Sequence, residues 1–189
     1  MKKLVIALGV SVLLGACAGS GMSNASSSAA TPMVGGAPMY PTKDIVDNAV
    51  NSKDHTTLVA AVKAADLVAT LKSPGPFTVF APTNASFAAL PAGTVDTLLK
   101  PENKATLTKV LTYHVVPGRM DSAALTSAIN AGGGKATLKT ASGGTLTATM
   151  SGGTVWVTDA KGGTAAVTIA NVYQSNGVIH VVNKVLLPG

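Results

Sequence analysis

Phe77-Thr-Val-Phe-Ala-Pro-Thr-Asn-Ala-Ser-Phe87 is the stretch that decides the fold of this 189-residue chain. Its first half carries the aromatic and β-branched residues that are typical of a buried strand, namely Phe77, Val79 and Phe80. Pro82 has no N–H to donate to a neighbouring strand, so the strand should end there. Thr83 or Asn84 can then cap a short helix that contains Phe87. The stretch therefore predicts a strand-to-helix corner held by aromatic side chains.

A second informative stretch, Asn176-Gly-Val-Ile-His-Val-Val-Asn-Lys-Val-Leu-Leu-Pro188, ends the chain. Asn176-Gly177 predicts a tight turn in which these residues supply the positive φ angles. Residues 178–187 would be apolar on both faces of a strand, which indicates a central strand buried on both sides. Tyr113-His114-Val-Val-Pro lies between the two stretches.

These three motifs together resemble the fasciclin domain family. Residues 77–87 resemble its first signature block, residues 176–188 resemble its second, and Tyr113-His114 is similar to its Tyr-His motif. The resemblance implies a compact wedge of β-strands with packed helices. It also implies an adhesion or matrix-binding module without catalytic activity, an expectation that rests on fold-level analogy. We interpret the signature residues as core-forming: Phe77, Phe80, Pro82, Thr83, Asn84, Phe87, Asn176, Gly177 and His180.

The resemblance also indicates candidate binding residues. In adhesive animal members an Asp-Ile pair just before the second block is implicated in receptor binding, and here Asn171 and Val172 occupy the matching positions. Asn171 carries no charge to engage a receptor's metal ion, which argues against integrin-style recognition. Tyr113 and His114 match the family motif. The candidate binding or adhesion residues are therefore Tyr113, His114, Asn171 and Val172.

The remaining pattern predicts helices first and strands second. Apolar residues recur at helical spacing in 45–50 and 58–62, Pro101-Glu102 can open a third helix, and Asp121 or Ser122 can cap a fourth. Thr/Val/Ile-rich runs separated by glycine turns predict strands, mostly in antiparallel hairpins, at 136–140, 145–150, 154–158, 166–170 and 178–187. In the second run, Leu146, Ala148 and Met150 should form the dry face. This order predicts an α+β domain.

The N-terminus is typical of an export signal. Positively charged Met1-Lys2-Lys3 precedes an almost wholly apolar run, Leu4–Leu14, which is shorter than the roughly 20 residues of a membrane-spanning helix. The run ends in Leu14-Gly15-Ala16-Cys17, which resembles the lipobox of bacterial lipoproteins. We therefore predict a lipoprotein signal peptide over residues 1–16 and an acylated Cys17, carrying palmitate or similar chains.

Cys17 is the only cysteine in the sequence, and an unpaired thiol in an exported protein needs an explanation. Two alternatives remain: a free thiol after ordinary signal cleavage, or a buried cysteine in a chain without a signal. Neither explains why the cysteine falls at the cleavage site. Two or more acyl chains give stable anchoring to a lipid bilayer. By resemblance to lipoproteins of diderm bacteria, Ala18 in place of Asp points to the outer membrane.

Residues 17–41 are rich in Ser, Ala, Gly and Pro, and residues 18–41 contain no charged residue. Such a segment buries too little apolar surface to offset its ordering entropy, so we predict a flexible tether. Residues 42–189 are predicted to form one fasciclin domain. With 47% apolar and 12% charged residues, most of the chain should fold.

Composition and spacing argue against several functions. The net charge is +6, but the basic residues are scattered and aromatic residues make up 4% of the chain, which argues against a nucleic-acid partner. His55, His114 and His180 lack the close spacing of a metal site, and no cofactor is expected. A histidine in an apolar strand is more often a core residue bonded to a backbone carbonyl or to the Tyr113 hydroxyl. We therefore predict no catalytic residues.

Three functions remain to be compared. The favoured one is a monomeric, envelope-anchored adhesion or binding module whose partner is a protein, a polysaccharide or another surface. The alternative is an envelope protein that binds a small apolar or polysaccharide ligand in a groove between sheet and helices. The third is a hydrolase in which His114 or His180 lies within about 3 Å of a hydroxyl and has an orienting carboxylate.

Overall fold

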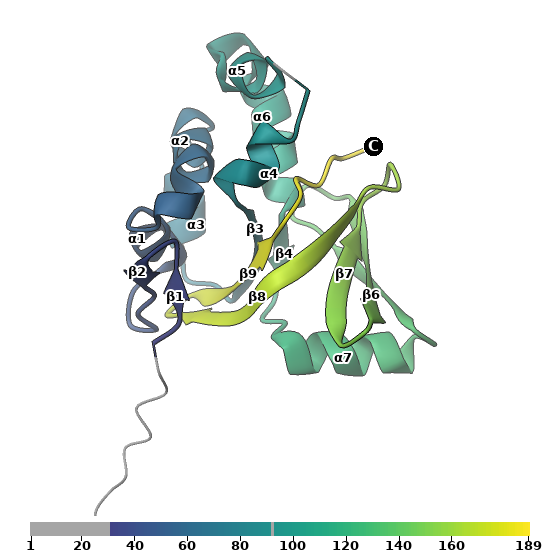
Figure 1. Ribbon diagram of the computed structural model, residues 1–189. Helices are drawn as coiled ribbons and strands as arrows, with labels where there is room; N and C mark the ends of the chain where they lie inside the picture. The colour runs from purple at the N-terminus through teal and green to yellow at the C-terminus, as the bar shows by residue number, and fades with distance from the viewer. Residues whose placement is uncertain (1–30, 92) are drawn as a thin grey trace, which may run out of the picture.

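The computed structural model describes residues 31–91 and 93–189 (Figure 1). The predicted signal peptide, Cys17 and residues 18–30 lie outside the described residues. The fold is α+β, as predicted, with a mostly antiparallel sheet and helices packed against it. No helix in the described part of the chain is long and apolar enough to cross a membrane.

A seven-stranded sheet organises the domain, in the order β4-β3-β9-β8-β7-β6-β5. Its strands are β3 (Phe77–Pro82), β4 (Val115–Pro117), β5 (Lys135–Lys139), β6 (Thr145–Ser151), β7 (Thr154–Thr158), β8 (Thr164–Gln174) and β9 (Gly177–Val182). Among these seven strands only β3 and β9 pair in parallel, so the two signature blocks lie side by side with Phe80 opposite His180. The sheet is curved, so that its edge strands β4 and β5 approach each other at one end. There, Ala141 N, two residues beyond β5, donates a hydrogen bond to Val115 O of β4 at 2.7 Å.

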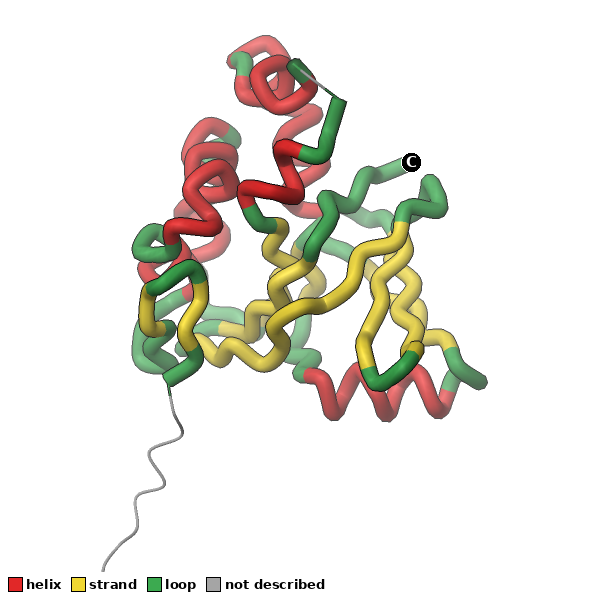
Figure 2. The backbone as a smooth tube through the Cα atoms, viewed as in Figure 1, coloured by secondary structure: helices red, strands yellow, loops and turns green. Residues whose placement is uncertain are grey.

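The helices form two groups on opposite sides of this sheet (Figures 1 and 2). One group holds α1 (Ile45–Ala49), α2 (Thr56–Ala64), α3 (Val68–Lys72), α4 (Asn84–Ala88), α5 (Thr94–Leu99) and α6 (Lys104–Tyr113), with the 3₁₀ turns η1 (Lys53–His55) and η2 (Pro101–Asn103). The last helix, α7 (Ser122–Ala131), packs alone against β5, β6 and β7.

The buried apolar residues form two clusters that meet at β3 and β9. Val79 and Ala81 of β3, with Ile179 and Val181 of β9, join the cluster under the first helix group. Phe80 and Val182 face the other way, into the cluster under α7. Because alternate side chains of a strand point to opposite faces, both faces of β3 and β9 are buried; their residues are apolar apart from Thr78 and His180. The prediction of a central strand buried on both sides is confirmed.

Some predicted boundaries were wrong. β9 ends at Val182 rather than residue 187, because Asn183 and Lys184 are exposed and the Asn183 side chain accepts a hydrogen bond from Ala166 N at 2.8 Å. Met150 was placed on the dry face of β6 but is 38% exposed, since it lies beside the turn that leads to β7.

The tether prediction differs from the structure over its second part. Residues 33–38 form a small hairpin, β1 (Met33–Val34) and β2 (Ala37–Pro38), whose turn is Gly35-Gly36 with φ of 59° and 75°. These glycines supply the left-handed geometry of a two-residue hairpin turn. Val34 and Met39 are buried against the domain, so the folded region begins before residue 42. We name residues 32–40 the strap.

Candidate functional site at the β8 bulge

Tyr113, predicted as a binding residue, lies in the interior and is 1% exposed. Its hydroxyl donates to Thr145 O at 2.6 Å and accepts from Ala160 N at 3.0 Å. Burial raises the pKa of the phenol. Tyr113 therefore joins the end of α6 to the start of β6 and to the loop after β7, and its side chain forms no surface.

His114 is also buried, and both of its ring nitrogens form hydrogen bonds. Nδ1 lies 2.8 Å from Val110 O, and Nε2 accepts a hydrogen bond from Leu186 N at 3.0 Å. Because Nε2 must be unprotonated to accept this bond, the ring is the neutral tautomer with hydrogen on Nδ1. Burial lowers its pKa to about 4. The prediction of a core histidine bonded to a backbone carbonyl is confirmed here.

His180 and His55 are neutral core residues as well. His180 Nε2 donates to Met120 O at 2.8 Å, and its ring stacks on Phe80 with centroids 5.7 Å apart. His55 Nδ1 lies 2.9 Å from the hydroxyl of Ser52, a pair that the sequence analysis did not identify. Burial lowers the pKa of both rings. His114 and His180 contact backbone oxygens and an N–H, not the hydroxyl and carboxylate that the hydrolase hypothesis requires.

Thr83 performs one of the two predicted capping roles, whereas Asn84 has a role that was not predicted. Thr83 caps α4, with Oγ1 accepting from Ser86 N at 3.3 Å. The Asn84 side chain reaches η1 and α2: its Oδ1 accepts from Thr57 N of α2 at 3.0 Å, and its Nδ2 donates to Lys53 O of η1 at 2.8 Å. The first signature block thus anchors the helices to the sheet.

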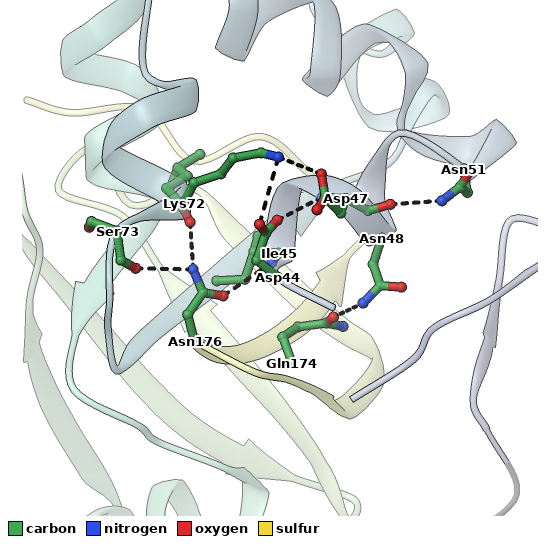
Figure 3. Close-up of polar contacts among 10 residues, drawn as sticks. Asp44, Ile45, Asp47, Asn48, Asn51, Lys72, Ser73, Gln174 and Asn176 are labelled. Atoms are coloured by element: carbon green, nitrogen blue, oxygen red, sulfur yellow. Dashed lines mark hydrogen bonds and ion pairs between the residues drawn. The ribbon is translucent and has the colours of Figure 1, made fainter. Parts of the chain in front are cut away.

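Asn176 and Gly177 have a different role from the one predicted. Neither residue has a positive φ. Asn176 instead links three segments: Oδ1 accepts from Ile45 N at 3.1 Å, and Nδ2 donates to Leu71 O at 2.7 Å (Figure 3). Gly177 is required by close packing, because a Cβ there would lie 2.1 Å from Phe77 O. These contacts depend on segments more than 90 residues apart in the chain.

A second set of polar contacts fastens the strap near the same turn. Asn48 is fully buried; its Oδ1 accepts from Tyr40 N at 3.0 Å, and its Nδ2 donates to Tyr40 O and to Gln174 Oε1. Beside it, Lys72 on α3 forms an ion pair with Asp47 on α1 at 2.5 Å (Figure 3). This cluster holds α1, α3 and the β8–β9 turn together.

Asn171 and Val172 lie where β8 departs from regular pairing with β9. Asn171 has a φ of 60°, a conformation that Asn tolerates better than most residues. Its Oδ1 accepts from Ser122 N and its Nδ2 donates to Ser122 Oγ, both at 2.7 Å. Val172 is fully buried. The bulge therefore turns Asn171 toward the start of α7 and leaves Val172 in the core.

Two exposed side chains, Arg119 and Tyr173, and two half-buried ones, Asp121 and Asn171, surround this bulge, and we name these four residues the bulge patch. The Arg119 guanidinium lies 5.1 Å from the centroid of the Tyr173 ring, and the Tyr173 hydroxyl is 3.4 Å from Asp121 Oδ2. Asp121 also caps α7 through Ala124 N at 2.8 Å. Tyr173 is 36% exposed. The patch presents an aromatic ring, a cation, a carboxylate and an amide.

Of the four predicted binding residues, only Asn171 takes part in this surface. Tyr113, His114 and Val172 are buried, so the prediction that they contact a partner directly is not compatible with their positions. Arg119 and Tyr173 were missed, because they are far apart in sequence and meet only through the start of α7 and the β8 bulge. Within residues 31–91 and 93–189, no three His, Cys, Asp or Glu side chains are placed to hold a metal ion.

Residues 31–91 and 93–189 form an α+β fold with a mostly antiparallel sheet, a core that contains the motifs, and a polar-aromatic surface patch at the β8 bulge. The chain belongs to the fasciclin domain family, since residues 53–188 match the family model for the fasciclin domain. Both signature blocks and the Tyr-His motif fall within this match.

The chain is similar to bacterial proteins in sequence and to an insect protein in structure. It is 49% identical over 146 residues to Protein sll1483 of Synechocystis, covering 76% of this chain and 73% of that one. It is 33% identical over 123 residues to the cell surface glycolipoprotein MPB83 of Mycobacterium bovis, covering 65% of this chain and 48% of the relative. A solved FAS1 domain pair from the insect cell adhesion molecule Fasciclin I matches with a TM-score of 0.69 at 15% identity, over 77% of this chain and 51% of that chain, and so supports the fold.

Proposed function

We propose that the protein is a non-catalytic adhesion or binding module that is held on a membrane of the cell envelope by lipid on Cys17. Family membership supports the adhesive role, because the Fasciclin I domains of similar fold come from a cell adhesion molecule. The lipobox-like Leu14–Cys17 supports the anchor, as does similarity to a relative named a cell surface glycolipoprotein. The partner is a protein or polysaccharide surface.

The bulge patch is the observation that carries this proposal. Tyrosine and arginine are the residue types that most often dominate binding energy at protein interfaces. The Tyr173 ring is already held by Arg119 and Asp121, so little side-chain freedom would be lost on binding. A polysaccharide partner would use the same exposed ring face.

A pair of matched double variants tests the patch. Arg119→Ala with Tyr173→Ala should reduce surface attachment of cells to the level of a deletion strain, with the protein still present at normal abundance. The control is Lys43→Ala with Tyr40→Ala, which removes another exposed cation–aromatic pair: Tyr40 ends the strap, and Lys43 Nζ lies 5.3 Å from the centroid of its ring. The control should attach normally. Equal attachment by wild type and the deletion strain would refute an adhesive role.

The anchor requires a separate test. We expect Cys17→Ala to release the protein in soluble form or to leave its precursor uncleaved, and Cys17→Ser to behave in the same way. Fractionation and mass spectrometry of the mature N-terminus measure this directly. Normal processing with retention at the membrane would contradict the lipid anchor without affecting the case for the bulge patch.

A cavity favours the second candidate, binding of a small apolar ligand. It measures about 80 Å³, lies between the first helix group and β3, and exposes only apolar atoms, with Leu58, Val62, Leu71 and Val79 among its lining residues. An engineered protein cavity of about 150 Å³ binds benzene, so this one fits only a smaller molecule or an alkyl end. Organic extraction of the purified protein followed by mass spectrometry distinguishes the two functions: a stoichiometric lipid or chromophore favours ligand binding.

A further inference from the structure

The two edge strands of the sheet border an open groove. β4 and β5 meet only where Ala141 N bonds to Val115 O, and they share no ladder of hydrogen bonds. Beyond that bond, a groove of about 780 Å³ separates them, with α7 along its wall. All five residues of β5 line it. Since successive residues point to opposite faces, a groove that touches every one must run along the edge of the strand.

The free edge of β5 can pair with a further strand. An edge strand presents a row of backbone N–H and C=O groups without a neighbour, a ready template for pairing with another chain. Val116, Met120 and Ala128 supply apolar wall on the other side of the groove. Alternate side chains of an incoming strand would contact this wall, while its backbone paired with β5.

The charged residues beside the groove indicate what kind of strand could bind there. Lys135 and Lys139 are exposed at the two ends of β5, and neither forms an ion pair with any residue that the structure describes. Helix α7 carries no charged residue. Lysines on an edge also oppose pairing between copies of one protein. In an antiparallel pair of β5 strands, Lys135 of one copy would lie opposite Lys139 of the other, and like charges there are destabilising.

We propose that the β4–β5 groove binds an extended, acidic peptide segment of a partner protein, which adds a strand to β5. Its carboxylates lie about four residues apart, so that they meet Lys135 and Lys139. The strand spacing of about 3.4 Å per residue fixes this separation at about 14 Å. The proposal does not depend on the bulge patch, because it uses other side chains and the backbone of β5.

The test measures fluorescence anisotropy of a labelled nine-residue peptide titrated with the full-length protein in detergent. The peptide alternates threonine and valine and carries glutamates four residues apart. We expect saturable binding that weakens at least tenfold in Lys135→Gln with Lys139→Gln. The matched control, Lys100→Gln with Lys161→Gln, removes two other exposed lysines and should bind within twofold of wild type.

Two further peptides separate strand pairing from general attraction. A peptide with glutamine in place of both glutamates should bind at least tenfold more weakly, and a peptide with alternate backbone nitrogens methylated should not bind. No binding of the parent peptide, equal loss in both lysine pairs, or unchanged binding of the methylated peptide would each overturn the proposal. So would a dimer of the free protein whose interface is β5.

Discussion

The buried motif residues and the bulge patch differ in what their side chains contact. Tyr113 and His114 are enclosed, and their polar atoms are bonded to backbone groups of β6, the loop after β7 and the C-terminal segment. Arg119 and Tyr173, by contrast, are exposed; the Arg119 guanidinium lies over the Tyr173 ring, and the Tyr173 hydroxyl is bonded to the Asp121 side chain. The buried motif residues Tyr113 and His114 therefore stabilise the fold, whereas Arg119 and Tyr173 of the proposed binding surface lie outside the motifs. Removing residues from each region tests this difference.

The largest effect is expected for His114→Ala. The change leaves Leu186 N–H without its buried acceptor and opens a cavity, which together should lower the free energy of unfolding by about 3 kcal/mol. Urea denaturation measures the loss. Arg119→Ala, the control in the bulge patch, should change stability by less than about 0.5 kcal/mol. Similar losses in both variants would remove the distinction between the two regions.

Acid should lower the free energy of unfolding over a defined pH range, because the buried histidines are neutral in the folded state. The His114 imidazole titrates near 6.5 when unfolded and at about 4 when folded, so between these values only the unfolded state takes up its proton. The neutral His114 ring makes its full contribution to the free energy of unfolding above pH 6.5. As the pH falls from 6.5 toward 4, this free energy decreases by about 3 kcal/mol. Burial of His55 and His180 acts in the same direction. An NMR titration should show the folded His114 ring uncharged at pH 5; protonation near pH 6.5 would contradict this account.

The same substitution, Tyr to Phe, can be made in the buried motif and in the bulge patch, and each removes one hydroxyl. Tyr113→Phe leaves Thr145 O and Ala160 N without their partner and should cost about 2 kcal/mol. Tyr173→Phe removes an exposed hydroxyl with one long bond and should cost less than about 0.5 kcal/mol. Thermal unfolding of the two variants under one condition provides the measurement. A larger loss for Tyr173→Phe would show that the patch is structural.

The smallest expected difference lies at the bulge itself. Asn171→Ala loses both bonds to Ser122 and places alanine at a positive φ, at a cost of about 1 to 2 kcal/mol. Asn171→Asp keeps the acceptor at the start of α7, where a negative charge is favourable, and should be within about 0.5 kcal/mol of wild type. Chemical denaturation distinguishes the two, and equal losses would show that the side-chain bonds contribute little.

Local pattern predicted much of the fold. The corner at Pro82, the Thr83 cap, the helix start at Asp121 and the strands between glycine turns were confirmed, because each depends on a few neighbouring residues. The strap was missed. Gly35-Gly36 is equally compatible with a flexible linker and a hairpin turn, and only burial of Val34 and Met39 distinguishes them.

The sequence by itself determined the class of fold and the family, since hydrophobic periodicity, turn residues and three ordered motifs are local properties of the chain. It also predicts export and lipidation at Cys17, which stay predictions. Only the tertiary structure decided that Tyr113, His114 and Val172 are buried, that Asn176 joins three segments, and that Arg119 meets Tyr173. The physical reason is that burial and side-chain contact depend on how distant segments pack, and sequence spacing carries no record of that arrangement.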